Sequence, residues 1–317
     1  MNIKLSEAIR LYLVDKRGQG LSPNTLADYR TTFKKLQAFL SCDPTISSIE
    51  ADTVRDFFNS VTGITNKTKL NYHAGLSALW TWATEERKIC KVHIIREIKP
   101  ARPEKVSIVP FSQAEVKKII AGLINSKPFP KSNGELVKPR LLDPLIAARN
   151  RAIILFLLDS GLRASELCGL KLGDIRTGEH GVYLVDVSQL YAKYSRGRVV
   201  PISSRTFELV QKYLQLRGQV GPDEYLFLAD NGEKLRRDTL RQMLVQVKER
   251  CGLKVANAHK FRHTFAINFL RNGGDVFTLQ AILGHSTFDM VKRYLAIAET
   301  DIERGHAKAS PVTNWEL

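Results

Sequence analysis

The chain has 317 residues, of which 44% are hydrophobic, and a formal charge of +16. Such a basic excess indicates a polyanionic partner, because each Lys or Arg placed on a phosphate releases a condensed counterion. The length favours two domains, and the four widely spaced cysteines exclude a zinc knuckle or a disulfide framework. The longest apolar run, residues 152–158, is too short to span a bilayer. A cytoplasmic protein without a membrane partner is therefore expected.

The first 99 residues are predicted to be entirely helical. Ser22 followed by Pro23 is typical of an N-cap with proline in the first helical turn, and apolar residues at spacings of three and four then extend that helix to Leu40. Lys67 and Lys69 begin another helix, where they oppose the helix dipole. A phosphate contact would offset this placement, and a solvated helix end explains it equally well. The predicted helices cover about residues 5–14, 23–40, 53–59 and 67–87.

Residues 100–106, with Pro100 and Pro103 among charged residues, are predicted to link a first domain, residues 1–99, to a second, residues 107–317. In the second domain, Ser112 and Glu115 have the spacing of a capping box. Residues 125–144, rich in Pro, Lys, Asn and Gly, indicate a surface loop or insertion. Further helices are expected over 112–123, 146–159, 205–217 and 237–250 and from Arg163, and strands over 183–187 and 199–202. The predicted fold is therefore mainly α, with a small antiparallel β-sheet and two domains.

Two basic residues upstream have the chemistry of phosphate ligands. Arg163 follows Gly161 at an expected helix N-terminus, where free N–H groups and a planar guanidinium can receive a phosphate. Lys193 lies in the basic turn between the two strands, and lysine is suited to donate a proton to a leaving oxygen. Each residue alone is as well explained by a solvated surface, and Arg196 and Arg198 compete for any function in the turn.

The segment 258–294 contains a denser set of polar groups on what the sequence indicates are two short helices. His259 and Arg262 share one helix face. His263 lies one turn from His259, but the glutamate of an H-E-x-x-H motif is absent, which disfavours a metal site. His285 follows a glycine in a turn, and Tyr294 lies on an amphipathic stretch. Taken singly, the last two could be packed core residues.

Together and in this order, the motifs resemble the tyrosine recombinase (phage integrase) family, its Xer-like members especially. The resemblance covers about residues 107–300, and the first hundred residues look like the helical core-binding domain of that family. The motifs that carry it are GLRASEL at 161–167, the lysine turn leading to RVVP at 198–201, HKFRHTFA at 259–266, LGHS at 283–286, and Tyr294.

The resemblance implies a role for each matching residue. Tyr294 would attack the scissile phosphate and form a 3′-phosphotyrosyl link. Arg163 and Arg262 would clamp the non-bridging oxygens, and Lys193 would protonate the leaving 5′-oxygen. His259 would accept the tyrosine proton. His285 would hydrogen-bond the phosphate. No metal ion, ATP or other cofactor is implied.

The resemblance also implies partners. The chain would clamp duplex DNA between its two domains and assemble with other copies of itself as a dimer or tetramer, with a related recombinase or an accessory protein as a further candidate. The residues after Tyr294, a helix-like run over 296–307 and a tail with Trp315, would dock on a neighbouring protomer. A type IB topoisomerase or telomere resolvase, and a non-catalytic DNA-binding protein, are the rival hypotheses. Chromosome-dimer resolution and integration or excision of a mobile element fit these residues equally.

Overall fold

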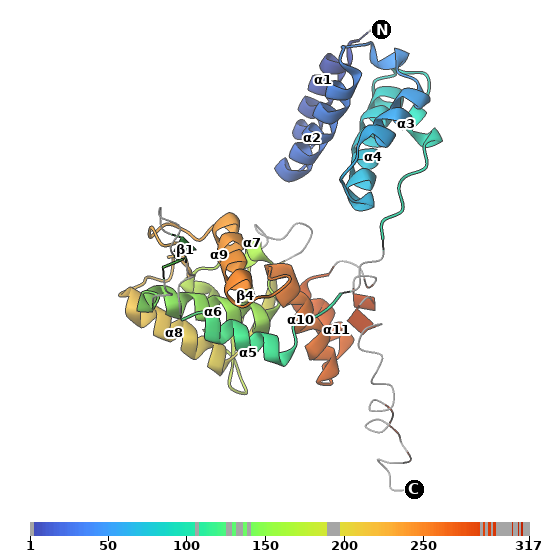
Figure 1. The fold of residues 1–317 in the computed structure, drawn as a ribbon. Helices are drawn as coiled ribbons and strands as arrows, with labels where there is room; N and C mark the ends of the chain where they lie inside the picture. The colour runs from blue at the N-terminus through green and yellow to red at the C-terminus, as the bar shows by residue number, and fades with distance from the viewer. Residues whose placement is uncertain are drawn as a thin grey trace. The chain divides into compact units, whose positions relative to one another are not determined.

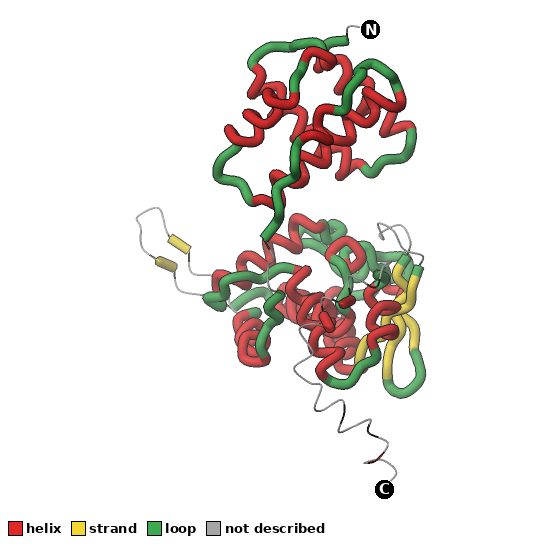
Figure 2. Tube along the Cα trace, turned by 90° about the vertical axis from the view of Figure 1, so that its right-hand side faces the viewer, coloured by secondary structure: helices red, strands yellow, loops and turns green. Residues whose placement is uncertain are grey.

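The computed structural model describes residues 3–104, 108–124, 141–188 and 197–285, with 129–130, 136–137 and, toward the C-terminus, 288, 291–292, 294–295, 306, 310 and 312. The chain forms two compact units, Met1–Ser107 and Ile108–Leu317 (Figure 1). Helices dominate both units, and the strands of the described residues all belong to the second (Figure 2). The predicted fold class, mainly α with a small antiparallel sheet, is confirmed.

The N-terminal unit is a helical bundle whose boundaries follow local capping signals. The Ser22 hydroxyl accepts the backbone N–H of Thr25 at 3.2 Å and so starts the second helix where the sequence predicts. The first helix continues beyond the predicted end at residue 14, because Lys16 and Arg17 lie in a last turn that favours positive charge. The helices are α1 (Leu5–Gly18), α2 (Pro23–Leu40), η1 (Ile46–Ser48), α3 (Ala51–Ser60), α4 (Asn66–Thr81), the π-helical turn η2 (Trp82–Glu86) and η3 (Ile94–Glu97).

Aromatic side chains fill the centre of this bundle. The ring of Tyr12 on α1 meets Phe33 of α2 at 5.7 Å and Trp82 of η2 at 5.8 Å, both edge-on. All three side chains are almost completely buried. Edge-to-face contacts of this kind add to the stabilisation that comes from burial itself. The unit therefore has a core of its own.

The second unit contains the sheet and the remaining helices. Ser112 and Glu115 form the predicted capping box, with both hydrogen bonds present. The helices are α5 (Gln113–Gly122), α6 (Pro144–Ser160), α7 (Ala164–Leu167), η4 (Leu172–Asp174), α8 (Ser204–Arg217), α9 (Arg237–Arg250), α10 (Ala258–Arg271) and α11 (Val276–Leu283). The strands are β1 (Phe129–Pro130), β2 (Leu136–Val137), β3 (Ile175–Thr177), β4 (Val182–Val187) and β5 (Arg198–Ser203).

Two features of the β-structure differ from the prediction. The segment predicted as a surface loop, residues 125–144, contains the antiparallel pair β1 and β2. The main sheet has a third strand, β3, which pairs with β4 along three residues. Strands this short carry no periodicity of their own, and their partners decide their conformation.

Helix α6 is the central element of the second unit. It packs against α8, α10 and β5, and its side chains are buried on more than one face, including Ile153, Phe156 and Leu157. Val185 of β4 pairs with Val200 of β5, and both are fully buried beneath the helices. Asp159, near the C-terminal end of α6, accepts the backbone N–H of Ser203 at the end of β5 at 2.7 Å, and Gly161, directly after the helix, accepts Arg262 of α10 at 2.8 Å. This end of α6 therefore joins segments that are distant in the sequence.

Several predicted features lie outside the described residues. They are Lys193 with the turn around it, the predicted helix-like run over 296–307 except for residue 306, and the tail residue Trp315.

Candidate active site

Gly161 ends α6 and opens the site. Its φ of 61° is in the left-handed region, and a Cβ atom there would lie 2.5 Å from the ring of Phe265 on α10. Only glycine allows both the turn and this close approach of α10. The chain then passes to Arg163, which precedes α7. This helix has a single turn, so the predicted dipole contribution to phosphate binding is small, and the charge comes from the guanidinium.

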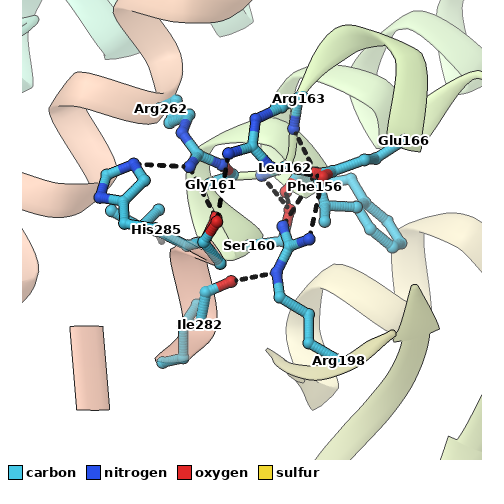
Figure 3. Close-up of polar contacts among 12 residues, drawn as sticks. Phe156, Ser160, Gly161, Leu162, Arg163, Glu166, Arg198, Arg262, Ile282 and His285 are labelled. Atoms are coloured by element: carbon cyan, nitrogen blue, oxygen red, sulfur yellow. Dashed lines mark hydrogen bonds and ion pairs between the residues drawn. The ribbon is translucent and has the colours of Figure 1, made fainter. Parts of the chain in front are cut away.

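Glu166 is a buried carboxylate that holds two arginines (Figure 3). It accepts the backbone N–H of Arg163 at 2.8 Å and Nη1 of the same residue at 2.8 Å. Arg198, the first residue of β5, donates through Nη1 at 2.9 Å and Nη2 at 2.8 Å. Burial alone would raise the pKa of Glu166, but the hydrogen bonds and charges of Arg198 and Arg163 outweigh it and lower the pKa to about 2.

Arg198 ties this cluster to the end of α11. Its Nε donates to the carbonyl of Ile282 at 2.6 Å. Gly284, with a φ of 62°, lies so close that a Cβ atom would meet Arg198 Cδ at 2.9 Å. Arg163 Nη2 also donates to the Gly284 carbonyl, at 3.3 Å. The turn that carries His285 is therefore fixed to Arg163 and to Arg198, the first residue of β5.

Arg262 on α10 is the most buried cation of the site, with 2% of its surface exposed. It donates to the carbonyls of Gly161 at 2.8 Å and Leu283 at 2.7 Å, and to Nε2 of His285 at 2.9 Å (Figure 3). Burial, with the charge of Arg163, lowers the pKa of Arg262 to about 10, so it remains protonated at neutral pH. Three guanidinium groups, those of residues 163, 198 and 262, thus face one carboxylate, which leaves a surplus of positive charge beside the pocket.

His285 is buried against this arginine and is neutral. Burial first, then the charges of Arg262 and Arg163, lower the pKa of its imidazole to about 4. Because Nε2 accepts a hydrogen bond from Arg262, the proton of the neutral ring belongs on Nδ1. Its ring stacks on Tyr294 with centroids 6.2 Å apart and planes 12° apart. His285 therefore supports both the second arginine and the tyrosine.

Tyr294 is buried, with 3% of its surface exposed, and its hydroxyl lies 2.8 Å from Nδ1 of His263. The ring of His259 packs edge-on against His263 with centroids 4.2 Å apart, while the rest of His259 is exposed to solvent. Partial burial, with the charges of Arg262 and Arg163, lowers the pKa of His259. In the described part of the chain no group of three or more His, Cys, Asp or Glu side chains could hold a metal ion.

These groups surround a pocket of about 180 Å³. Five of the six predicted site residues line it, although the first lies 96 residues before the next: Arg163, His259, Arg262, His285 and Tyr294. A pocket with a surplus of guanidinium charge and a buried tyrosine suits nucleophilic attack on a phosphate.

Sequence comparison decides the family. A model of the Phage integrase family matches residues 139–301, which is more than half of the chain. The chain belongs to the phage integrase family.

Within this family the chain is a Xer-like tyrosine recombinase. It is 27% identical to the tyrosine recombinase XerC of Pelobacter propionicus over 96% of this chain and 94% of the relative. Its fold is similar to XerH bound to its difH substrate, with a TM-score of 0.71 and 20% identity over 96% of this chain and 84% of the other. It is also similar to a lambda integrase tetramer bound to a Holliday junction, with a TM-score of 0.67 and 19% identity over 90% of this chain and 78% of the other.

The sequence alone does not reveal the contacts of three residues in this recombinase's site. Glu166 lies three positions after Arg163, which indicates a local pair, but its contact with Arg198 joins residues 32 positions apart. The sequence presents Arg198 only as a rival of Lys193 in the turn, and His263 only as a possible metal ligand. The motif around Arg262 names no role for His263, so only the tertiary contact with Tyr294 reveals one.

No helix among the described residues is long and apolar enough to cross a membrane.

Proposed function

We propose that this tyrosine recombinase cuts and rejoins duplex DNA at a specific sequence through a covalent 3′-phosphotyrosyl intermediate on Tyr294. The observation that carries the proposal is the convergence of Tyr294 with Arg163 and Arg262 on one small pocket. A phosphodiester has two non-bridging oxygens, and each arginine offers a donor fork of matching geometry.

In the cleavage step, the Tyr294 oxygen attacks phosphorus and the bond between phosphorus and the 5′-oxygen breaks. Arg163 and Arg262 offset the negative charge that builds on the non-bridging oxygens, and their own positions are fixed beforehand by Glu166, Gly161 and Leu283. Such preorganisation is effective because no reorganisation of the donors is needed during the reaction.

Two proton transfers complete the step. His259, at the exposed side of the pocket and neutral, takes the phenol proton, and Lys193 gives a proton to the leaving 5′-oxygen. The link from Arg198 to Glu166 anchors the first residue of β5, which follows the lysine turn in sequence. Religation is the reverse reaction with a different 5′-hydroxyl, and the phosphotyrosyl bond conserves the energy for it, so no ATP is consumed.

The N-terminal unit supplies a second basic surface for DNA. A cavity of about 410 Å³ there is bordered by Arg55, Lys69 and Lys99, and Lys67 lies exposed at the start of α4. Cations at the beginning of a helix oppose its dipole, and a bound phosphate would offset this. Contacts of this kind fix the position of a protein on duplex DNA without reading its sequence. We therefore assign this unit to DNA clamping.

We further infer that four copies assemble on two DNA sites, in the cytoplasm where chromosomal or mobile DNA is the substrate. The support is the likeness in fold to a lambda integrase tetramer bound to a Holliday junction. Exchange of strands between two duplexes requires a cleaving copy on each strand, and a symmetric tetramer provides this.

The test is covalent trapping. DNA fragments that remain attached to the wild-type protein under denaturing conditions are sequenced, and the recovered site is built into a nicked suicide duplex. Tyr294→Phe is expected to abolish the adduct on this duplex and to retain DNA binding. The control is Tyr183→Phe, which removes a hydroxyl from β4, where the ring stacks on Phe207. An adduct formed by Tyr294→Phe would refute the assignment, and relaxation of any supercoiled plasmid regardless of sequence would favour a topoisomerase.

A further inference from the structure

His263 contacts the reacting atom of the proposed cleavage step. Its Nδ1 lies 2.8 Å from the Tyr294 hydroxyl, and the ring centroids are 5.5 Å apart. The phenol can only donate to a neutral imidazole nitrogen, so Nδ1 is the acceptor when the ring is uncharged. The contact therefore fixes the direction of the O–H bond as well as the position of the oxygen.

The surroundings leave the tyrosine ring little freedom. It packs with buried side chains of α10 and α11, among them Ala266, Ile267 and Leu283, and stacks on His285. The aromatic body is thus held by apolar contacts, whereas the hydroxyl is held by His263. Arg262 and His263 are adjacent on α10, so one helix positions both a phosphate clamp and the nucleophile.

We propose that His263 is a positioning residue for the nucleophile, holding the Tyr294 oxygen in the pocket through a hydrogen bond to Nδ1 as DNA is bound and attacked. The proposal rests on the proposed function of Tyr294 and adds a residue to it. The role differs from the one proposed for His259, which is to accept the proton of the same hydroxyl. His263 needs only a lone pair.

The electrostatic environment of His263 suits a hydrogen-bonding role. Partial burial first, then His259 and Arg262, lower the pKa of His263 to about 4. A group whose conjugate acid is this weak is a poor acceptor for a phenol proton at neutral pH. Its hydrogen bond, however, is unaffected, because the neutral ring is the form that accepts it. The hydrogen bond to Nδ1 therefore holds Tyr294 in its protonated form at the pocket.

Substitution of His263 by Asn or Gln distinguishes holding of the Tyr294 hydroxyl from transfer of its proton. The side-chain oxygen of Asn can occupy the place of Nδ1, whereas Gln reaches the place of Nε2, and neither amide takes up a proton. Single-turnover cleavage is measured on the nicked suicide duplex that carries the site recovered with the wild-type protein. We expect His263→Ala and His263→Gln to cleave at least about 10-fold more slowly, because misplacement of a reacting group by about 1 Å can cost about 100-fold. The cleavage rate of His263→Asn should remain within about 3-fold of the wild-type rate if only the hydrogen bond to Tyr294 is required.

Controls separate this proposal from folding and from the function itself. Affinity for the uncleaved duplex should be unchanged in all three variants, and His180→Asn, at an exposed turn residue, should cleave as the wild type does. If His263→Asn is as slow as His263→Ala, the residue transfers the proton and positioning is refuted. If His263→Ala is as fast as the wild type or faster, the contact is not productive and the proposal fails while the Tyr294 assignment stands. Adduct formation by Tyr294→Phe would refute both the assignment of Tyr294 as the nucleophile and the positioning role of His263.

Discussion

Both units of the chain pair arginine with carboxylate, but water reaches the pairs to very different degrees. In the N-terminal unit, Arg96 and Glu85 meet at 2.5 Å with 64% and 51% of their side chains exposed. In the second unit, the Glu166 side chain is fully buried and the Arg198 side chain is 9% exposed. The bond lengths are similar, so the difference lies in the surroundings.

The comparison shows why only one of these pairs can build an active site. An exposed pair exchanges water contacts for protein contacts at little net gain. A buried carboxylate has lost its water and must be fully paired, so its partners are held firmly. Arg163, whose side chain remains 33% exposed, is anchored by Glu166 and can still meet a phosphate. Burial of the anion thus converts a flexible cation into a rigid ligand.

The largest effect is expected for Glu166→Gln. The substitution keeps the shape of the side chain but leaves buried guanidinium groups without their anion, which should cost about 3–5 kcal/mol of unfolding free energy. Cleavage should fall by about 100-fold as Arg163 loses its anchor. Amide hydrogen exchange in α7 and α10 reports the stability of this unit separately. Glu179→Gln, at a side chain that is 93% exposed, is the control and should change stability by less than about 0.5 kcal/mol.

The effect of Glu166→Gln on the unfolding free energy should depend on pH in a defined direction. The pKa of Glu166 is about 2 in the folded protein, against an ordinary value of 4.5. A lowered pKa contributes stability that is complete above about pH 4.5 and is lost as the pH falls toward 2. The stability difference between the wild type and Glu166→Gln should therefore narrow across this range. A constant difference would show that the charge of Glu166 is not what stabilises the cluster.

Helices in both units could be predicted because their signals are local. Ser22 and Ser112 cap helices through residues three positions away, and apolar spacing reports the buried face. Strand β3 could not be predicted, since Ile175–Thr177 is too short to show alternation and exists through its pairing with β4. The same holds for β1 and β2 within the predicted loop.

The candidate site divides in a similar way. The motifs identified Arg163, Arg262 and Tyr294, which now line one pocket. The contact between His263 and Tyr294 could not be predicted, because His259 and His263 share a helix face and the spacing does not say which ring meets the phenol. The packing of the segment that carries Tyr294 against α10 decides this. The contact of Arg198 with Glu166 likewise could not be predicted, because it depends on β5 lying beside α7.

An intermediate effect is expected for Asp15→Ala in the N-terminal unit. Asp15 is partly exposed, but it accepts the indole N–H of the buried Trp82 at 2.8 Å and hydrogen bonds from Nε and Nη2 of Arg87. Loss of the acceptor leaves the indole unsatisfied, which should cost about 1–3 kcal/mol. Asp15→Asn keeps an acceptor for Trp82 and should cost less. Tryptophan fluorescence during urea unfolding measures both, and equal losses would show that the charge rather than the indole bond is important.

The smallest effect is expected for Arg96→Ala, which breaks the exposed pair with Glu85. Its loss should change the unfolding free energy by less than about 0.5 kcal/mol, because water replaces the contact on both side chains. A double-mutant cycle with Glu85→Ala, followed by the same fluorescence, isolates the pair and should give a coupling that shrinks further as salt is added. A coupling above about 1 kcal/mol would mean that exposure does not set the strength of these pairs. The rigidity of Arg163 would then need a cause other than the burial of Glu166.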